Sequence, residues 1–536
     1  MTLTALITFA GGIGLFLLGM RLMSDGLKVA AGSALRDLLA RATGSPLRAL
    51  GSGALITALV QSSSAVIFAT IGFVNAGLLT LAQAVGVIVG ANLGTTLTSW
   101  IVAVAGFNID LRVLAMPAIA LGMGAWIGGR GRGIALGQAL VGFGVFFLGL
   151  DVLKGAFAGA DALFALTTQA GEGVAQILLF TGVGIVLTLL MQSSSAALAV
   201  TLTAAAGGML PLPAAAAMVI GANVGTTSTA VFATLGATAA ARRTAAAHVV
   251  FNLVAATASL IVLPWILALA MVLADALGLG DQPPSVLALV HTMSNLLGVV
   301  LIWPFMNPLV GFLEARFVRR EIDPAVPRHL DDTVLATPRL AIDALALELA
   351  RIGATAHQMA RTALNHAASA HDLAADDAVI EALGEAAIGF TSAVNSGGDA
   401  FIDNALPDAV RVVQYCRGVA DSALDLAANP ASGTLPESLA TQLEDLRDAA
   451  NQVLTASDPA PGRVPDESAI AHAVDAFERS YPTIKAELLR AGSRATVSAG
   501  ILVRELDRIS ATRRLVDQAG KAGRFLARLT PAPTAT

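Results

Sequence analysis

The sequence predicts an all-α protein in which a polytopic membrane domain is followed by a soluble helical bundle. Of the 536 residues, 55% are apolar and 13% are charged, whereas soluble proteins average about 25% charged residues. No formal charge occurs in 49–109 or in 173–241. Each stretch is long enough for two or three membrane segments of about 20 residues. Charged residues recur every few positions only from Asp323 onward, which separates a membrane part from a soluble part.

A duplication organises the membrane part. The sequence QSSSA at 61–65 recurs at 192–196, and GANLGTT at 90–96 recurs as GANVGTT at 221–227, so both pairs are offset by 131 residues. A third pair, GLFLLGM at 14–20 and GVFFLGL at 144–150, is offset by 130. Anchors at nearly one offset indicate a repeat. Transporters often pair such repeats in opposite orientations, so we expect two inverted repeats with broken or re-entrant helices.

The predicted elements follow in order. The first repeat, about 4–130, carries an apolar helix, an amphipathic piece, one segment broken at QSSS, one broken at GANLGTT and a last helix. The second repeat, about 134–262, resembles it, and an extra helix completes a membrane domain over 1–318. The expected helices lie at 4–22, 26–41, 111–128, 134–153, 174–208, 212–236, 244–272 and 286–312.

The remaining chain is predicted to contain a linker at 319–329, a helical domain at 330–530 and a disordered tail at 531–536. Leu340, Leu345, Leu349 and Ile352 form one apolar stripe at helical spacing. Basic residues around Arg316 favour a cytoplasmic exit from the membrane. We therefore expect a multi-pass protein of the cell (inner) membrane whose C-terminal domain is cytoplasmic.

The polar motifs are the candidate sites. A single serine in a membrane helix commonly bonds back to its own helix, but Gln and three Ser in succession, present twice, suit a helix that unwinds and lines a cavity. The glycines of GANxGTT permit tight helix packing or a turn, and the Asn and Thr side chains make packing alone an incomplete explanation. A broken helix presents N–H groups to anions, while its carbonyl end and nearby side-chain oxygens suit a small cation.

These ligands are all neutral, so an anion held at membrane depth needs a countercharge. A co-bound cation supplies one, which favours cation-coupled anion transport over a site built on Arg or Lys. His248 with Asn252 and His291 with Asn295 share the spacing H-x-x-x-N, for which we consider bonding between helices and a role in the site or in proton sensing. The sequence contains no metal-ligand cluster, nucleophile triad or P-loop, and we expect no enzyme activity and no nucleic-acid partner.

The duplicated QSSS and GANxGTT motifs resemble those of the type II sodium–phosphate cotransporter family over roughly 1–310. The resemblance implies sodium-coupled symport of inorganic phosphate, with sodium as coupling ion and no other cofactor. It implies a substrate site at both motifs, formed by Gln61, Ser62, Ser63, Ser64, Asn92, Gln192, Ser193, Ser194, Ser195 and Asn223. It implies sodium ligands among Gln61, Ser64, Thr95, Thr96, Gln192, Ser195, Thr226 and Thr227.

The domain at 330–530 resembles PhoU, a regulator of phosphate uptake, which implies a regulatory role and a regulatory protein partner. RELDRISATR at 504–513 keeps Glu505, Asp507 and Arg508 of an acidic PhoU signature but has Ser510 at its last acidic position, so we expect no metal beyond sodium. Two alternatives stay open. One is a transporter or exporter of phosphate or another oxyanion, and the other is a membrane-anchored phosphate sensor or regulator.

Overall fold

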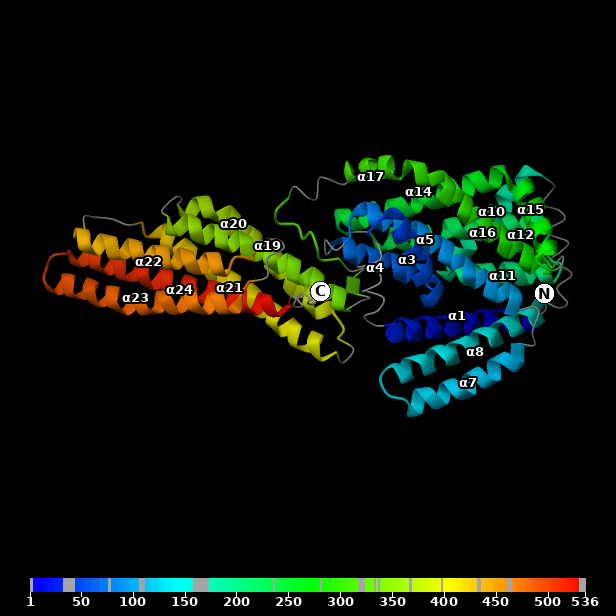
Figure 1. Cartoon of the computed structure of the whole chain (residues 1–536), viewed down its shortest axis with the longest axis horizontal. Coiled ribbons are helices and arrows are strands. Elements are labelled where there is room, and N and C mark those ends of the chain that lie inside the picture. The colour runs from blue at the N-terminus through cyan, green and yellow to red at the C-terminus, as the bar shows by residue number, and fades with distance from the viewer. Residues whose placement is uncertain are drawn as a thin grey trace. The chain divides into compact units, whose positions relative to one another are not determined.

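The computed structural model describes residues 3–31, 44–75, 79–105, 111–157, 173–234, 237–279, 282–316, 323–331, 334–335, 338–365, 369–396, 399–430, 435–459 and 465–529. The chain divides into two compact units, Met1–Phe317 and Val318–Thr536. The described elements are helical in both units (Figure 1). The predicted tail at 531–536 and residues 319–322 of the predicted linker lie outside the described residues.

The first unit is the apolar one. Eight of its helical segments are long and apolar enough to cross a membrane. Its α-helices are α1 (Leu3–Ala31), α3 (Pro46–Val60), α4 (Ser63–Asn75), α5 (Leu81–Trp100), α7 (Leu111–Gly128), α8 (Arg132–Phe157), α10 (Val174–Met191), α11 (Ser194–Ala206), α12 (Leu212–Gly225), α13 (Thr227–Ala233), α14 (Ala239–Ile261), α15 (Leu263–Ala276), α16 (Pro283–Ile302) and α17 (Met306–Glu314).

Both QSSS motifs interrupt a helix, as the sequence predicts. The first separates α3 from α4, and the second separates α10 from α11. At about 1.5 Å per residue, the 13-residue helices α4 and α11 are about 20 Å long, shorter than a hydrocarbon core of about 30 Å. Helix α11 is buried from Ser194 to Ala205. Short buried helices of this kind are typical of broken or re-entrant segments.

Glycines bring the helices of each half close together at matching positions. Helix α3 packs against α5, and α10 packs against α12. A Cβ atom at Gly53 or Gly90 would collide with the carbonyl oxygen of Val87 or Leu50, respectively. The glycines 131 residues later, Gly184 and Gly221, have equivalent neighbours in Met218 and Thr181. Close backbone approach therefore explains the glycines at these positions, and it is the same in both halves.

The predicted break at GANLGTT is wrong in the first half. Helix α5 continues through the motif from Leu81 to Trp100 and passes into a π-helical turn, Ile101–Ala105. Gly90 and Gly94 retain helical backbone because they lie against α3. In the second half, α12 ends at Gly225 and α13 begins at Thr227, so an interruption lies at the predicted motif only in this copy.

Three further boundaries differ from the predictions. Helix α1 continues to Ala31 in place of a separate piece starting at residue 26, and residues 32–41 of that piece lie outside the described residues. The helix predicted at 244–272 is two helices, because Pro264 begins α15. The helix predicted at 286–312 is interrupted at Trp303–Phe305, which contains Pro304. A proline lacks the N–H that an uninterrupted helix requires.

Helices α1, α7 and α8 form a neighbouring group in which α8 contacts the other two (Figure 1). Gly19 of α1 lies against the backbone of Phe146, and Gly122 of α7 lies against that of Val141. Phe16 stacks on Phe146, with ring centroids 4.5 Å apart. Helix α8 is therefore held by glycine contacts on one side and by aromatic packing on the other.

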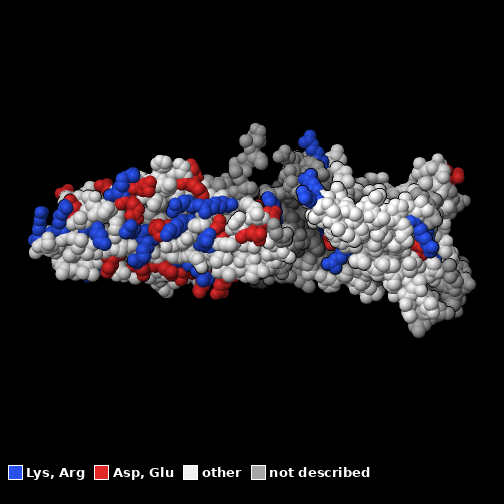
Figure 2. Space-filling view, turned by 90° about the horizontal axis from the view of Figure 1, so that it is seen from below, with Lys and Arg blue, Asp and Glu red and all other residues white. Residues whose placement is uncertain are grey.

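The second unit is a six-helix bundle that carries charged side chains over its surface (Figure 2). Helices α19 (Pro338–Leu364), α20 (Ala370–Ala393) and α21 (Ala400–Ala428) pack on one another, and so do α22 (Glu437–Ala456), α23 (Glu467–Ser493) and α24 (Ala499–Leu529). The two groups meet chiefly through α21 and α24. The predicted stripe of Leu340, Leu345, Leu349 and Ile352 is buried in the shared core.

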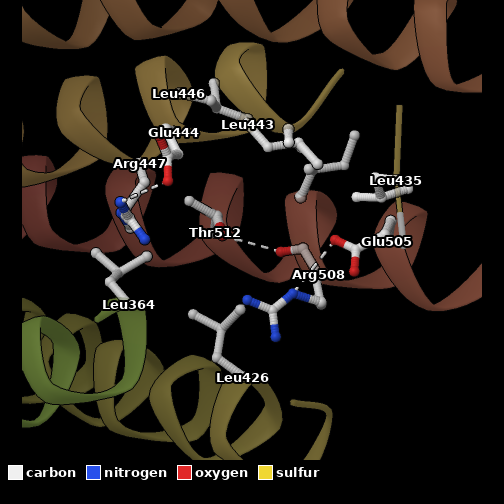
Figure 3. Close-up of a pocket in the computed structure, with 12 residues that line it drawn as sticks. Leu364, Leu426, Leu435, Leu443, Glu444, Leu446, Arg447, Glu505, Arg508 and Thr512 are labelled. Atoms are coloured by element: carbon white, nitrogen blue, oxygen red, sulfur yellow. Dashed lines mark hydrogen bonds and ion pairs between the residues drawn. The ribbon is translucent and has the colours of Figure 1, made fainter. Parts of the chain in front are cut away.

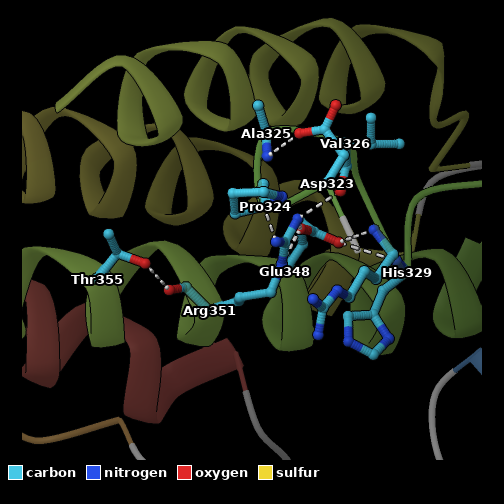
Figure 4. A network of polar contacts seen from close by, with 9 residues as sticks. Asp323, Pro324, Ala325, Val326, His329, Glu348, Arg351 and Thr355 are labelled. Atoms are coloured by element: carbon cyan, nitrogen blue, oxygen red, sulfur yellow. Dashed lines mark hydrogen bonds and ion pairs between the residues drawn. The ribbon is translucent and has the colours of Figure 1, made fainter. Parts of the chain in front are cut away.

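The segment at 323–331 is bound to the first helix of this bundle (Figure 4). The fully buried carboxylate of Glu348 accepts hydrogen bonds from the backbone N–H groups of Arg328 and His329, at 2.9 and 2.8 Å. Arg351 donates to the Pro324 and Val326 carbonyl oxygens and pairs with Glu348. The buried charge is thus fully hydrogen-bonded, and this part of the predicted linker has a defined structure.

Candidate functional site

The first break places a glutamine in an unusual backbone conformation. Gln61 follows the end of α3 with φ 57° and ψ 30°, the left-handed region. That conformation costs a non-glycine residue about 1–2 kcal/mol. Its side chain is held at both ends, because Nε2 donates to the Ala58 carbonyl at 2.5 Å and Oε1 accepts from the Thr98 hydroxyl at 2.9 Å. The strain is therefore offset by specific contacts with α3 and α5.

The second break repeats the backbone but not the side-chain contacts. Gln192 has φ 51° and ψ 26°, and its Nε2 donates to the Leu189 carbonyl at 2.6 Å. The counterpart of Thr98 is Thr229, which donates to the Thr226 carbonyl of its own segment. Gln61 is buried and Gln192 is exposed. The two halves thus present one restrained and one accessible glutamine.

The serines begin the second helix of each pair. Ser62 and Ser193 cap α4 and α11, accepting hydrogen bonds at 3.3 Å from the N–H groups of Ala65 and Ala196. Ser63 and Ser64, and likewise Ser194 and Ser195, occupy the first turn. Backbone N–H groups in a first turn have no acceptor within the helix, and the helix dipole favours an anion there. Each QSSS motif therefore has the local chemistry of an anion site.

The GANLGTT side chains bond within α5. Asn92 donates from Nδ2 to the Ile88 carbonyl at 3.0 Å, and Thr95 and Thr96 donate to the carbonyls of Ala91 and Leu93 at 2.9 and 2.7 Å. All three side chains are buried. Their remaining lone pairs are oxygen acceptors, a chemistry that suits a cation better than an anion.

The GANVGTT side chains differ from these. Thr226 and Thr227 donate to the carbonyls of Asn223 and Val224, at 2.5 and 2.8 Å. Asn223 itself points its Oδ1 toward Nε2 of His291 in α16, at 2.9 Å. The three side chains are only half-buried. The second motif is therefore more accessible than the first.

Helix α16 connects the two halves, and sequence reasoning did not foresee how. Nδ1 of the fully buried His291 lies 2.7 Å from the Ser99 hydroxyl of α5, while Nε2 contacts Asn223 of α12. Trp100 also donates to Thr292 at 3.0 Å. The spacing H-x-x-x-N was the available signal, but Asn295 only donates to the His291 carbonyl of its own helix. The expected bond between helices is made with Asn223.

Two further threonines belong to the repeat and were also missed. Thr57 and Thr188 lie four positions before each glutamine and against Gly94 and Gly225. Their hydroxyls are buried and have no hydrogen-bond partner among the described residues. The ring nitrogens of His248 are in the same condition within that part of the chain. The only available sequence signal for the threonines is their shared offset.

The second unit contains a pocket of about 290 Å³ between α22 and α24 (Figure 3). Glu505 and Arg508 pair on its wall at 3.4 Å, and Arg508 also donates to the Asn429 carbonyl at 2.7 Å. Burial raises the pKa of Glu505 and lowers the pKa of Arg508. The Glu505–Arg508 pair accounts for both buried charges, so nothing on this wall calls for a ligand ion. Among the described residues, no three His, Cys, Asp or Glu side chains gather as a metal site.

Comparisons with known proteins place the first unit in a family. The model of the Na+/Pi-cotransporter family matches residues 15–155 and 171–276. An Escherichia coli protein named as an inorganic phosphate export protein, YjbB, is 32% identical over 365 residues, which cover 66% of this chain and 64% of that protein. The chain thus matches less than two thirds of the length of that relative.

Two other relatives match parts of the same unit. The Bacillus subtilis protein YqeW, whose function is uncharacterised, is 30% identical over 309 residues, covering 56% of this chain and 95% of YqeW. The rabbit (Oryctolagus cuniculus) sodium-dependent phosphate transport protein 2A is 34% identical over 116 residues, covering 21% of this chain and 18% of that protein. No solved structure matches the chain. With its apolar helices, family-model match and near full-length similarity to YqeW, the chain is a multi-pass membrane protein of the Na+/Pi-cotransporter family.

Proposed function

We propose that the membrane unit carries inorganic phosphate across the bilayer with sodium as the coupling ion. The observation that carries this proposal is the pair of helices broken at QSSS with a left-handed glutamine in each break. Each break exposes backbone N–H groups for an anion and carbonyl groups for a cation. The sequence supplies no charged side chain within 49–109 or 173–241, so a bound cation provides the countercharge for phosphate.

The proposed sites follow the two repeats. Phosphate binds at Gln61–Ser64 and Gln192–Ser195, with Asn92 and Asn223. Sodium binds among the oxygens of Gln61, Ser64, Thr95, Thr96, Gln192, Ser195, Thr226 and Thr227. Inverted orientation of the two repeats would place both breaks near the bilayer midplane. The names of the relatives, a phosphate export protein and a sodium-dependent phosphate transport protein, support phosphate as the substrate class.

The direction of net flux depends on the gradients, because a secondary carrier moves its ions reversibly. The name of YjbB favours export as a second candidate for this chain. The domain at 330–530 is proposed to be a cytoplasmic PhoU-like regulatory domain that binds a regulatory protein. Basic residues near Arg316 support its cytoplasmic location.

Uptake of radiolabelled phosphate into proteoliposomes tests these proposals. An inward sodium gradient should drive accumulation, and an equal potassium gradient should not. Phosphate-loaded vesicles with an outward sodium gradient should release phosphate, as export requires. Equal uptake with and without sodium would contradict the coupling.

A chain ending at Glu321 separates a transporter from a sensor. A transporter with a regulatory domain should retain sodium-driven flux after this truncation, whereas a membrane-anchored sensor should bind phosphate without flux in both forms. Competition by sulfate or arsenate then defines the oxyanion. Preferred transport of sulfate would contradict phosphate as the substrate.

A further inference from the structure

Asn92 and Asn223 occupy the same position in the two motifs but have opposite hydrogen-bonding arrangements. Asn92 uses its amide nitrogen, donating to Ile88 of its own helix at 3.0 Å. Asn223 uses its carbonyl oxygen, which lies 2.9 Å from Nε2 of His291. A motif duplicated in sequence is therefore not duplicated in its exposed chemistry.

The arrangement of His291 follows from its two partners. A carboxamide oxygen only accepts, so Nε2 of His291 carries the proton in its contact with Asn223. In the neutral ring, Nδ1 is then an acceptor and takes the proton of the Ser99 hydroxyl, 2.7 Å away. Because His291 is fully buried, the ring is held between α5 and α12 and determines which way the Asn223 amide faces.

The groups left over differ between the halves. Among the described residues, Asn223 Nδ2 and Asn92 Oδ1 have no hydrogen-bond partner. Asn223 is half-buried, so its two N–H bonds remain accessible. Asn92 presents a carbonyl oxygen from the more buried motif. One half therefore offers donors and the other an acceptor.

We propose that His291 orients Asn223 to donate to phosphate, while Asn92 presents its oxygen to sodium. This inference rests on the proposed function and assigns separate roles to two residues that the repeat makes equivalent. Phosphate oxygens accept hydrogen bonds from the Asn223 amide, and sodium is ligated by oxygen, which Asn92 supplies. His291 is a positioning residue, since it acts through Asn223.

Two matched aspartate variants test the division of roles in sodium-driven uptake by the full chain. Asn92→Asp keeps oxygen at its position, so the KM for phosphate should stay within about twofold and the KM for sodium should not rise. Asn223→Asp replaces the donors by a carboxylate that repels phosphate, so the KM for phosphate should rise about tenfold or more. Equal effects of both variants on the KM for phosphate would overturn the proposal.

The histidine is tested by three variants. His291→Leu removes the donor to Asn223 and should raise the KM for phosphate about tenfold with little change in the KM for sodium. His291→Gln retains an N–H donor and should restore the KM for phosphate most of the way. His248→Leu is the control, because this equally buried histidine has no hydrogen-bond partner among the described residues.

The outcomes distinguish this inference from the proposed function. If the wild-type chain shows no sodium-driven uptake and no phosphate binding by calorimetry, both are wrong. If the wild type transports but His291→Leu changes the KM for sodium alone, only the inference is wrong. Calorimetric titration of each variant with phosphate gives its affinity even where flux is lost, and unchanged affinity in Asn223→Asp also overturns the inference.

Discussion

Thr98 donates a hydrogen bond to Gln61 Oε1 at 2.9 Å, which joins α5 to the break between α3 and α4. The glutamine is in a strained left-handed conformation and its side chain is buried. This contact fixes the carboxamide next to the serines that begin α4. Its counterpart in the second half is absent, because Thr229 bonds to its own segment.

Thr98→Val should therefore weaken the first break specifically. The change is nearly isosteric and leaves a buried oxygen without its donor, at a cost of about 1–3 kcal/mol. We expect lower thermal stability and severalfold slower sodium-driven phosphate uptake. Thr229→Val is the matched control and should leave uptake near the wild-type rate. Equal loss in both variants would contradict a specific role for the Thr98 contact.

Replacing Gln192 by glycine should separate backbone strain from side-chain chemistry. Glycine adopts the left-handed conformation without the cost of about 1–2 kcal/mol, so Gln192→Gly should retain or raise the melting temperature. Without the carboxamide, we expect phosphate uptake to fall at least tenfold. Ala495→Gly changes the one positive-φ non-glycine described in the second unit, and it should be stabilised with normal uptake. Normal uptake by Gln192→Gly would remove this side chain from the site.

Neighbouring glycines on α3 should respond oppositely to alanine. A Cβ at Gly53 would collide with the Val87 carbonyl oxygen, whereas a Cβ at Gly51 meets nothing within 4 Å. Gly53→Ala should lose about 1–3 kcal/mol or more through overpacking, and Gly51→Ala should be neutral or gain up to about 1 kcal/mol. Thermal unfolding in detergent measures both. The pair at Gly184 and Gly182 in α10 should behave in the same way.

Cys416 should be unreactive in the folded protein. It is the only cysteine of the chain and lies buried in α21, where burial raises its pKa to about 12. Because the thiolate is the reactive form, maleimide at pH 8 should label it only after denaturation. Val503→Cys adds a thiol at a position that is 57% exposed and should react within minutes. Fast labelling of native Cys416 would contradict the burial.

Acid should weaken the second unit through His357. Its Nδ1 donates to the Gly353 carbonyl at 2.8 Å, Nε2 accepts from Ser457 at 3.0 Å, and burial lowers the pKa of the imidazole. The unfolded chain takes up a proton near pH 6.5, whereas the folded chain takes it up only at lower pH. Stability is thus present above about pH 6.5 and is lost as the pH falls toward the folded pKa.

Urea midpoints at several pH values measure this dependence. Tyrosine absorbance reports the second unit alone, because both tyrosines, Tyr415 and Tyr481, lie in it. The midpoint should decrease between about pH 7 and pH 5, and His357→Gln should flatten the decrease. An unchanged slope in the variant would show that other groups govern it.

Much of the architecture could be predicted from local patterns. The QSSS breaks were predicted correctly, because consecutive polar residues in an apolar run are costly unless the helix opens. The GANLGTT break was wrong, because a glycine permits either a turn or a close helix contact. At Gly90 the neighbouring Leu50 decides for the contact. The pattern of the motif carries no information about that neighbour.

Composition, charge spacing and the offset of 131 residues were sufficient to predict a membrane part, a soluble part and two matching polar motifs. These properties are periodic or local, so the chain records them directly. The tertiary structure alone decided that Thr98 holds Gln61 and that His291 joins Ser99 to Asn223. His291 and Ser99 are 192 residues apart in the chain, and their contact arises from helix packing. Packing also gave two nearly identical motifs different exposed groups, because each motif has different neighbours.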